Sequence, residues 1–210
     1  MSTERKRKYV SVLRDDAAQV TRDRVLSAAK ALFVRHGIDR VTIAQIAERG
    51  KVAASTVFAL YKSKEGILRE LMSQAIFGQR YQSANAQLKE VTDPVKLIAL
   101  TSHVARAIYE GESSDLGLIR GASAFSPALR KLEQEFETTR FEMQEERLRL
   151  LFSQAKQKKG LGFDEARRIL WMYTSRDVFR MLVHEGGWTP DKYQKWLSDT
   201  LVNALVNAPR

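Results

Sequence analysis

The run from Ala54 to Tyr61 contains small, β-branched, hydroxyl and apolar side chains and carries no charge. Lysines bracket this run at Lys51, Lys62 and Lys64. A helix with small outward side chains can approach base edges closely, while flanking ammonium groups bind phosphates. The types and spacing of these residues therefore predict a groove-binding helix rather than a catalytic centre.

The net charge of the chain is concentrated around this run. The 210 residues carry a formal net charge of +10. Residues 1–64 contain 14 Lys/Arg and 6 Asp/Glu, a net of +8, whereas residues 65–210 contain 21 and 19, a net of +2. This asymmetry favours a polyanionic partner, either nucleic acid or an acidic membrane surface. The alternative is a basic tail that only aids solubility.

The composition argues against several functional classes. The chain has no cysteine, which excludes disulfides and thiolate-bound metals. The three histidines, His36, His103 and His184, lack the spacing of a bundle metal site, and no phosphate-binding glycine loop is present. No apolar run is long enough to cross a membrane, and no signal core follows the basic N-terminus. We therefore expect no metal, cofactor, catalytic residue or membrane partner, and a cytoplasmic location.

Apolar periodicity, caps and breakers predict an all-α fold. Residues 1–20 lack a clear period and are expected to form a flexible basic arm, although entry of its arginines into a minor groove is an alternative. Helices are then predicted from Thr21 to Gly37, from Thr42 to about Gly50, over 54–61, from Ser63 onward, from Asp93-Pro94, through Leu118 and Ile119, from Ser126-Pro127 to about Lys159, from Asp164 to 184–187, and from Thr189-Pro190.

Two of the short helices, 43–49 and 54–61, are separated by a tight turn and follow a longer helix. This order is the plan of a helix-turn-helix, in which the second short helix enters the major groove. In that arrangement Val52, Val57 and Tyr61 should pack inward. The alternative is a pair of small helices in an all-α fold with an exposed basic face.

The stretch "FVRHGIDRVTIAQIAERGKVAASTVFALYKSKEGIL" resembles the DNA-binding domain of the tetracycline-repressor (TetR) family of bacterial transcriptional regulators. The matching positions are Gly37, Thr42, Ile46-Ala47, Val52, Thr56, Val57, Phe58, Tyr61 and Ser63-Lys64-Glu65. The resemblance implies that Thr42 and Thr56 contact phosphates and that Lys64 anchors the DNA backbone. The candidate DNA-binding residues are Thr42, Lys51, Ala54, Ser55, Thr56, Phe58, Ala59, Lys62 and Lys64.

Three positions depart from the family pattern. Lys51 stands where the family usually has glycine, which adds a possible phosphate contact. Ala53 replaces the usual serine cap, and Phe58 replaces a tyrosine whose hydroxyl often reaches a phosphate. Ser55 is then the main polar base reader, while Ala54 and Ala59 can meet thymine methyl groups.

The resemblance also implies a domain plan and an assembly. The expected division is a flexible arm (1–20), a three-helix DNA-binding head with its helix-turn-helix (20–67), and a larger helical effector-binding and dimerisation domain (68–210). The segment 164–185 is apolar on nearly every side, which predicts neighbours on both flanks. In the family the two C-terminal helices pair with their symmetry mates, so we expect a C2 homodimer. The candidate interface residues are Trp196, Leu197, Leu201 and Leu205.

Members of the family usually sense a small molecule between helices four and eight. The candidate effector-binding residues are Phe77, Tyr81, His103, Phe136, Met143, Trp171, Met172, Arg176 and Phe179, although each is also compatible with a plain core position. Arg176 interrupts an apolar helix and needs a partner if it is buried. It would bind an anionic group on an effector or pair with a carboxylate, and we favour the pairing.

Together these features predict a dimeric repressor of a pseudo-palindromic operator, released by a small, mostly apolar effector of unknown identity. The partners are double-stranded DNA, a second copy of the chain and that effector. The alternative is a helical small-molecule-binding enzyme or adaptor whose basic surface does not read DNA.

Overall fold

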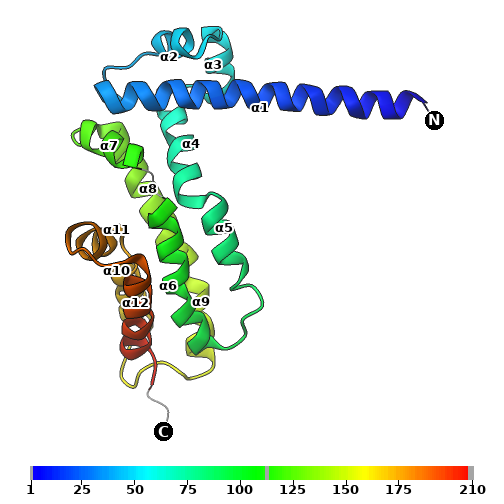
Figure 1. Cartoon of the computed structure of the whole chain (residues 1–210). Coiled ribbons are helices and arrows are strands. Elements are labelled where there is room, and N and C mark those ends of the chain that lie inside the picture. Colours follow the sequence, from blue (N-terminus) through cyan, green and yellow to red (C-terminus); the bar gives the residue numbers. More distant parts are fainter. Residues whose placement is uncertain (1, 112–113, 208–210) are drawn as a thin grey trace. The chain divides into compact units, whose positions relative to one another are not determined.

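The computed structural model describes residues 2–111 and 114–207, which form helices and no strand (Figure 1). In chain order the elements are α1 (Ser2–His36), α2 (Ile43–Gly50), α3 (Ala54–Tyr61), α4 (Lys64–Phe77), α5 (Gln79–Ala86), α6 (Pro94–Gly111), α7 (Ser114–Ala122), α8 (Pro127–Met143), α9 (Glu145–Ser153), α10 (Phe163–Tyr173), α11 (Arg176–Phe179), the π-helix η1 (Arg180–Glu185) and α12 (Pro190–Leu205). The all-α prediction is confirmed. Across these ranges, no helix has both the length and the apolar character that a membrane crossing needs.

The chain divides into two compact units. The first, here called the head unit, is Met1–Ser73 with Ser114–Leu132, and the second, here called the core unit, is Gln74–Ser113 with Glu133–Arg210. Helices α4 and α8 contribute residues to both units. The head unit thus includes α7 and the start of α8, which the sequence placed in the larger domain.

The first helix begins earlier than predicted but ends where the sequence predicted. Helix α1 begins at Ser2 rather than at Thr21, so the stretch expected to be an irregular arm is helical. It ends at His36, and Gly37 follows with φ +72°. A Cβ atom at Gly37 would lie 2.6 Å from the carbonyl oxygen of Ala122. Both the left-handed backbone and the close approach of α7 therefore require glycine at this position.

The short helices of the head follow their predicted caps. The Thr42 hydroxyl accepts from the backbone N–H of Gln45, and the Gln45 side chain accepts from the Thr42 N–H, a capping box at the start of α2. Ser63 accepts from the Gly66 N–H at 3.1 Å and caps α4. Ala53 supplies no side-chain cap to α3, as its replacement of serine predicts.

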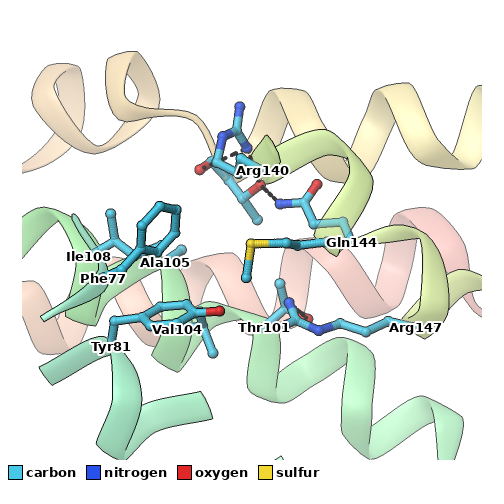
Figure 2. Close-up of a pocket in the computed structure, with 11 residues that line it drawn as sticks. Phe77, Tyr81, Thr101, Val104, Ala105, Ile108, Arg140, Gln144 and Arg147 are labelled. Carbon is cyan, nitrogen blue, oxygen red and sulfur yellow. Dashed lines mark hydrogen bonds between the residues drawn. The ribbon is translucent and has the colours of Figure 1, made fainter. Parts of the chain in front are cut away.

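Both long helices predicted in the second half of the chain are broken. The helix expected to reach Lys159 stops at Met143 and resumes as α9. The helix expected from Asp164 to 184–187 stops at Tyr173, and α11 starts at Arg176 with the Ser175 hydroxyl as its cap. Thr174 occupies this second break, where it accepts hydrogen bonds from Arg140 and Gln144 (Figure 2). Side-chain bonds from α8 and the α8–α9 turn thus replace part of the helix ladder at this break.

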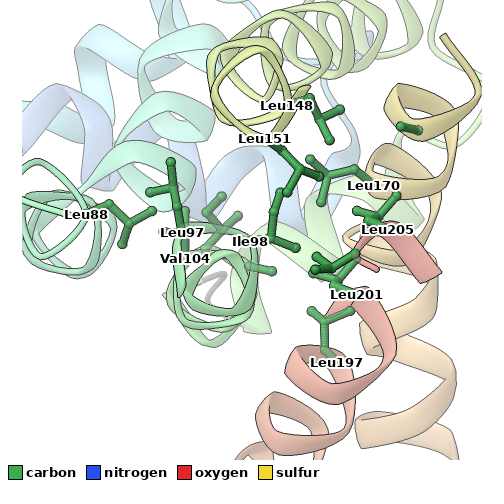
Figure 3. Close-up of a cluster of buried hydrophobic side chains, with 14 of the residues drawn as sticks. Leu88, Leu97, Ile98, Val104, Leu148, Leu151, Leu170, Leu197, Leu201 and Leu205 are labelled. Carbon is green, nitrogen blue, oxygen red and sulfur yellow. The ribbon is translucent and has the colours of Figure 1, made fainter. Parts of the chain in front are cut away.

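A continuous apolar cluster fills the core unit (Figure 3). Helix α12 packs along α6, and Leu197, Leu201 and Leu205 have no exposed surface in the single chain. Burial of each leucine side chain contributes about 1.5–3 kcal/mol to folding. The prediction that these leucines form the dimer interface is corrected accordingly, because a fully buried side chain has no surface left for a partner. Trp196 is only half-buried and remains available.

Candidate nucleic-acid interface and ligand pocket

Helix α3 has one buried side and one exposed side. Val57 is fully buried against the head, whereas Ser55 and Ala59 are exposed. Phe58 is 58% exposed, which is unusual for a large aromatic ring. Since Val52 and Tyr61 are partly buried, the exposed side of α3 is an uncharged strip of small side chains next to one aromatic ring.

Two exposed lysines flank this strip. Lys51 ends α2 with φ 52°, and Lys62 follows α3 with φ 64°. The Lys51 carbonyl accepts a 2.8 Å hydrogen bond from the Arg24 guanidinium, which ties the turn to α1. The Lys62 ammonium lies 5.8 Å from the centroid of the Phe58 ring. Both left-handed positions hold a lysine rather than a glycine, so each turn carries a positive charge at the expense of backbone strain.

Lys64 performs a structural task that the sequence did not reveal. Its ammonium donates to the carbonyl oxygens of Ile38 at 2.9 Å and Asp39 at 3.0 Å. The same loop is held by Ser123, which accepts from the Ile38 N–H at 3.0 Å, and by Ser126, which donates to the Asp39 carboxylate at 3.0 Å. Lys64 therefore helps to fix the α1–α2 loop, and any phosphate contact would use its remaining N–H.

The two threonines expected at phosphates lie at the starts of the two helices. Thr42 is exposed, and its hydroxyl accepts from Gln45 N–H and donates to the Gln45 side-chain oxygen. Thr56 is half-buried in the first turn of α3. The structure brings both threonines and Lys51, Ala54, Ser55, Phe58, Ala59, Lys62 and Lys64 into the same small region of the head.

A small cavity of about 30 Å³ lies in the core unit (Figure 2). Its lining residues are Phe77, Tyr81, Thr101, Val104, Ala105, Ile108, Arg140, Met143, Gln144, Arg147 and Thr174. Only Phe77, Tyr81 and Met143 belong to the effector set expected from the sequence. Phe77 makes edge contact with the Tyr81 ring at 5.2 Å and also contacts the Phe136 ring at 5.9 Å. Phe136 is therefore a neighbour of the lining rather than part of it.

The other expected effector residues lie elsewhere. Phe179 packs on Tyr109 and Tyr193 in the core, and Met172 is 47% exposed. Arg176 is partly buried at the start of α11. His103 lies by a separate surface hollow, where it contacts Gln194. Burial and the nearby Arg106 cation lower the pKa of His103, so that its neutral form is favoured.

The polar lining centres on Arg140, a residue that the sequence did not single out. The residue is 8% exposed, and its guanidinium donates to the Glu137 carboxylate at 2.6 Å, the Trp171 carbonyl at 2.9 Å and the Thr174 hydroxyl at 2.8 Å. Gln144 donates to the same hydroxyl at 2.8 Å, and that hydroxyl donates to the Leu170 carbonyl at 2.7 Å. The sequence signal was the spacing of 137, 140, 144 and 147, which would place four polar residues on one face of the unbroken helix predicted there.

Arg147 is the second arginine in the cavity lining. It donates to the Thr101 hydroxyl and to the Asn85 side-chain oxygen, each at a long 3.4 Å. Burial lowers the pKa of Arg147 because it disfavours the charged form, while Tyr81 and Glu146 oppose this shift. Figure 2 shows the Tyr81 hydroxyl and the Arg147 guanidinium on the same side of the cavity.

A larger hollow of about 760 Å³ adjoins the cavity in the core unit and shares Tyr81, Met143 and Arg147 with it. The remaining lining residues are Asn85, Leu88, Lys89, Val91, Leu97, Glu146, Arg149, Leu150 and Ser153. This volume falls within the range of about 300–1,000 Å³ that is usual for small-molecule sites. The small cavity and the hollow thus meet at Arg147.

Comparisons with known proteins agree with the geometry of the head. Residues 25–71 match the model of the bacterial regulatory proteins of the tetR family. The uncharacterized HTH-type transcriptional regulator YvkB of Bacillus subtilis (strain 168) is 39% identical over 54 residues, which cover 26% of this chain and 29% of that protein. YdeS, also an uncharacterized HTH-type transcriptional regulator of Bacillus subtilis (strain 168), is 25% identical over 191 residues and 88% of both chains.

Solved structures extend the likeness of fold over most of the chain. NalD, the secondary repressor of the MexAB-OprM multidrug efflux pump in Pseudomonas aeruginosa, gives a TM-score of 0.69 at 20% identity, with 91% of this chain and 98% of that chain covered. The SmeT–triclosan complex gives a TM-score of 0.67 at 20% identity, with 89% and 92% covered. With its helix-turn-helix, its exposed α3 and the match over residues 25–71, the head unit contains a DNA-binding domain of the tetR family of bacterial regulatory proteins, and the fold of the chain is that of these regulators.

Proposed function

We propose that this regulator is a homodimeric repressor that acts on DNA in the bacterial cytoplasm and is released by a small, mostly apolar effector. The observation that carries the DNA-binding part is the uncharged, exposed side of α3 between the exposed Lys51 and Lys62. The repressor part is supported by NalD, which is itself a repressor.

In this proposal α3 enters the major groove. Ser55 contacts a base edge through its hydroxyl, and Ala54 and Ala59 contact thymine methyl groups. Lys51 and Lys62 bind phosphates on either side, with Thr42 and Thr56 as further phosphate contacts. Phe58 lacks a hydroxyl, so its exposed ring would pack on the sugar–phosphate backbone instead.

Dimerisation would use exposed apolar side chains of the core unit instead of the buried leucines of α12. Met172 on α10 and Met181 on η1 are about half exposed, and Trp188 and Trp196 stack edge to face at 5.8 Å with part of their surface in solvent. Large exposed apolar side chains that gather on neighbouring elements are typical of a subunit contact. A C2 pair would present two α3 helices about 34–36 Å apart, one turn of DNA.

Coupling of effector to DNA would use the two helices that have residues in both units. Helix α4 begins at Lys64, which holds the α1–α2 loop, and ends at Phe77 in the cavity lining. Helix α8 follows Ser126, which binds the same loop, and carries Arg140 and Met143 of the cavity lining. An effector that binds one arrangement of these helices better would change the spacing of the heads.

The proposal is tested by selecting bound fragments from genomic DNA and measuring their affinity against salt. We expect a pseudo-palindromic sequence and a log–log salt slope that falls by about one unit in Lys62→Met. Ser55→Ala should change preference among sites and leave the slope unchanged. Equal affinity for selected and random fragments would sink the proposal, as would a wild-type protein that is monomeric at micromolar concentration.

A further inference from the structure

The two arginines of the cavity lining differ in how their charges are neutralised. Arg140 has the Glu137 carboxylate at 2.6 Å and backbone or hydroxyl oxygens for its other N–H groups. Arg147 has no carboxylate oxygen within 4.0 Å among the described residues, and its two hydrogen bonds reach neutral oxygens at 3.4 Å. A guanidinium has five N–H donors, so most of the donor capacity of Arg147 is unused.

The environment of Arg147 lowers the stability of the folded chain when no ligand is bound. Arg147 is partly buried, and a desolvated charge without an ion-pair partner is unfavourable unless a partner is supplied. Arg140 can be explained by stability, because it ties α8 to the break after α10. Arg147 cannot be explained in that way, since an apolar side chain of similar length would fill its place without the desolvation penalty.

The charges around the adjoining hollow do not supply the missing anion. Lys89 and Arg149 line it together with a single carboxylate residue, Glu146, which is exposed. The Glu146 charge offsets part of the desolvation of Arg147 but forms no ion pair with it among the described residues. Arg149 pairs with Glu145, which also binds Arg167 at 2.8 Å. The hollow therefore keeps an excess of positive charge next to Arg147.

The rest of the hollow is suited to hydrocarbon. Leu88, Val91, Leu97 and Leu150 line it, and Met143 lies at its junction with the small cavity. The Tyr81 hydroxyl and the Asn85 amide lie at the Arg147 end and can donate to the same anion. A ligand that matches these groups has one anionic end and an apolar body.

We propose that the effector site takes a monoanionic amphiphile whose anionic group pairs with Arg147 and whose apolar chain lies along Leu88, Val91, Leu97 and Leu150. This inference rests on the proposed ligand-responsive function and specifies its ligand class. A carboxylate is the simplest such head, because a guanidinium binds both of its oxygens at once. The effector is then not purely apolar, and its polar anchor is Arg147 rather than Arg176 or His103.

The test is calorimetric titration of the full-length protein without DNA, using three probes of equal chain length below their micelle concentrations. The probes are decanoate, decanol and decyltrimethylammonium. We expect decanoate to bind about 10- to 100-fold more tightly than decanol, as a charge-assisted hydrogen bond predicts, and the cation to bind least. Equal binding of decanoate and decanol, or no binding of either, would overturn the inference.

Variants separate a binding role from a structural one. Arg147→Met should remove the preference for decanoate over decanol while its melting temperature stays equal to that of the wild type or rises. Arg147→Lys should retain part of the preference. Lys156→Met removes the same charge from an exposed loop outside both hollows, and it should leave both affinities unchanged. An Arg147→Met protein that unfolds at lower temperature and keeps the preference would assign Arg147 a structural role and overturn the inference.

The outcome is independent of the DNA-binding proposal, because no DNA is present in the titration. Suppose that decanoate binds through Arg147 but that adding decanoate does not change operator affinity. The proposed ligand class is then upheld, and the proposed coupling between ligand and DNA binding is refuted. If operator binding is selective but decanoate is not preferred over decanol, the proposed DNA-binding function is upheld and the proposed ligand class is refuted.

Discussion

In the head unit, the caps that begin α2 and α4 are formed by residues close in sequence. Thr42 and Gln45 cap α2 across three residues, and Ser63 caps α4 across three. In the core unit, the Thr174 hydroxyl accepts from Arg140 and Gln144, which are 34 and 30 residues away in the chain. Local contacts form with their helix, whereas the distant ones form only when three helices have come together.

The difference has an energetic consequence. A helix cap contributes about 1 kcal/mol to stability, and replacing the capping residue removes only that one interaction. A buried network loses more than one bond when one member is removed, because the remaining donors stay desolvated. Substitutions in the buried network should therefore destabilise the chain more than the loss of a single cap.

Thr174→Val should lower the free energy of unfolding by about 2–4 kcal/mol, because it leaves donors of Arg140 and Gln144 without an acceptor. All three tryptophans belong to the core unit, so tryptophan fluorescence during denaturant unfolding reports on this unit. Thr138→Val is the matched control, since Thr138 is exposed and bonds only within its helix. An equal loss of unfolding free energy in both variants would show that the network does not add to stability.

Lys64→Met should destabilise the head by about 1–2 kcal/mol, because the carbonyls of Ile38 and Asp39 lose a charged donor. Circular dichroism during unfolding measures the loss. Lys62→Met should leave stability nearly unchanged, since that ammonium has only a distant ring contact. Both variants should weaken DNA binding. If Lys64→Met is as stable as the wild type, its ammonium is free for phosphate and the structural role is wrong.

Thr42→Ala should destabilise α2 by about 1 kcal/mol, through loss of the hydroxyl that accepts from the Gln45 N–H. Amide hydrogen exchange in α2 reports this change locally. Thr42→Ser keeps the hydroxyl and should retain most of the protection. Slower exchange in Thr42→Ala than in the wild type would contradict the capping account.

Lys51→Gly should raise head stability by about 0.5–1 kcal/mol and weaken DNA binding at the same time. The gain comes from relief of the left-handed backbone at φ 52°, and the loss from removal of a phosphate contact. Lys51→Ala loses the same charge but keeps the strain, so only the glycine variant should melt at higher temperature. Equal melting temperatures of the two variants would show that the turn is not strained.

Much of the head could be predicted from sequence because its signals are local. The ends of α2 and α3, the Ser63 cap and the glycine after α1 are each specified by residues within one turn. The start of α1 could not be predicted, because its first twenty residues have no apolar period. The structural use of Lys64 was also hidden, since its acceptors are backbone carbonyls 26 and 25 residues earlier.

The effector residues were predicted less well, for a related reason. Aromatic and methionine residues at helical spacing fill cores and line cavities alike, so Phe77 and Tyr81 could not be separated from Phe179 by pattern. The stripe of 137, 140, 144 and 147 was visible as a polar face, but a polar face usually points to solvent. The burial of Arg140 and Gln144 depends on their contacts with Trp171 of α10 and with Thr174.

The amino-acid sequence alone determined the helical class, the helix-turn-helix and the likeness of the head to the TetR DNA-binding domain, because caps, turns and the composition of one short helix act over a few residues. The tertiary structure decided which leucines are buried within one chain, where the two long helices break, and which arginine is bonded to the second break. Those outcomes depend on side chains from helices far apart in the chain. Arg140 and Arg147 are seven residues apart, yet the fold ties Arg140 to Trp171 and Thr174 and leaves Arg147 at a cavity.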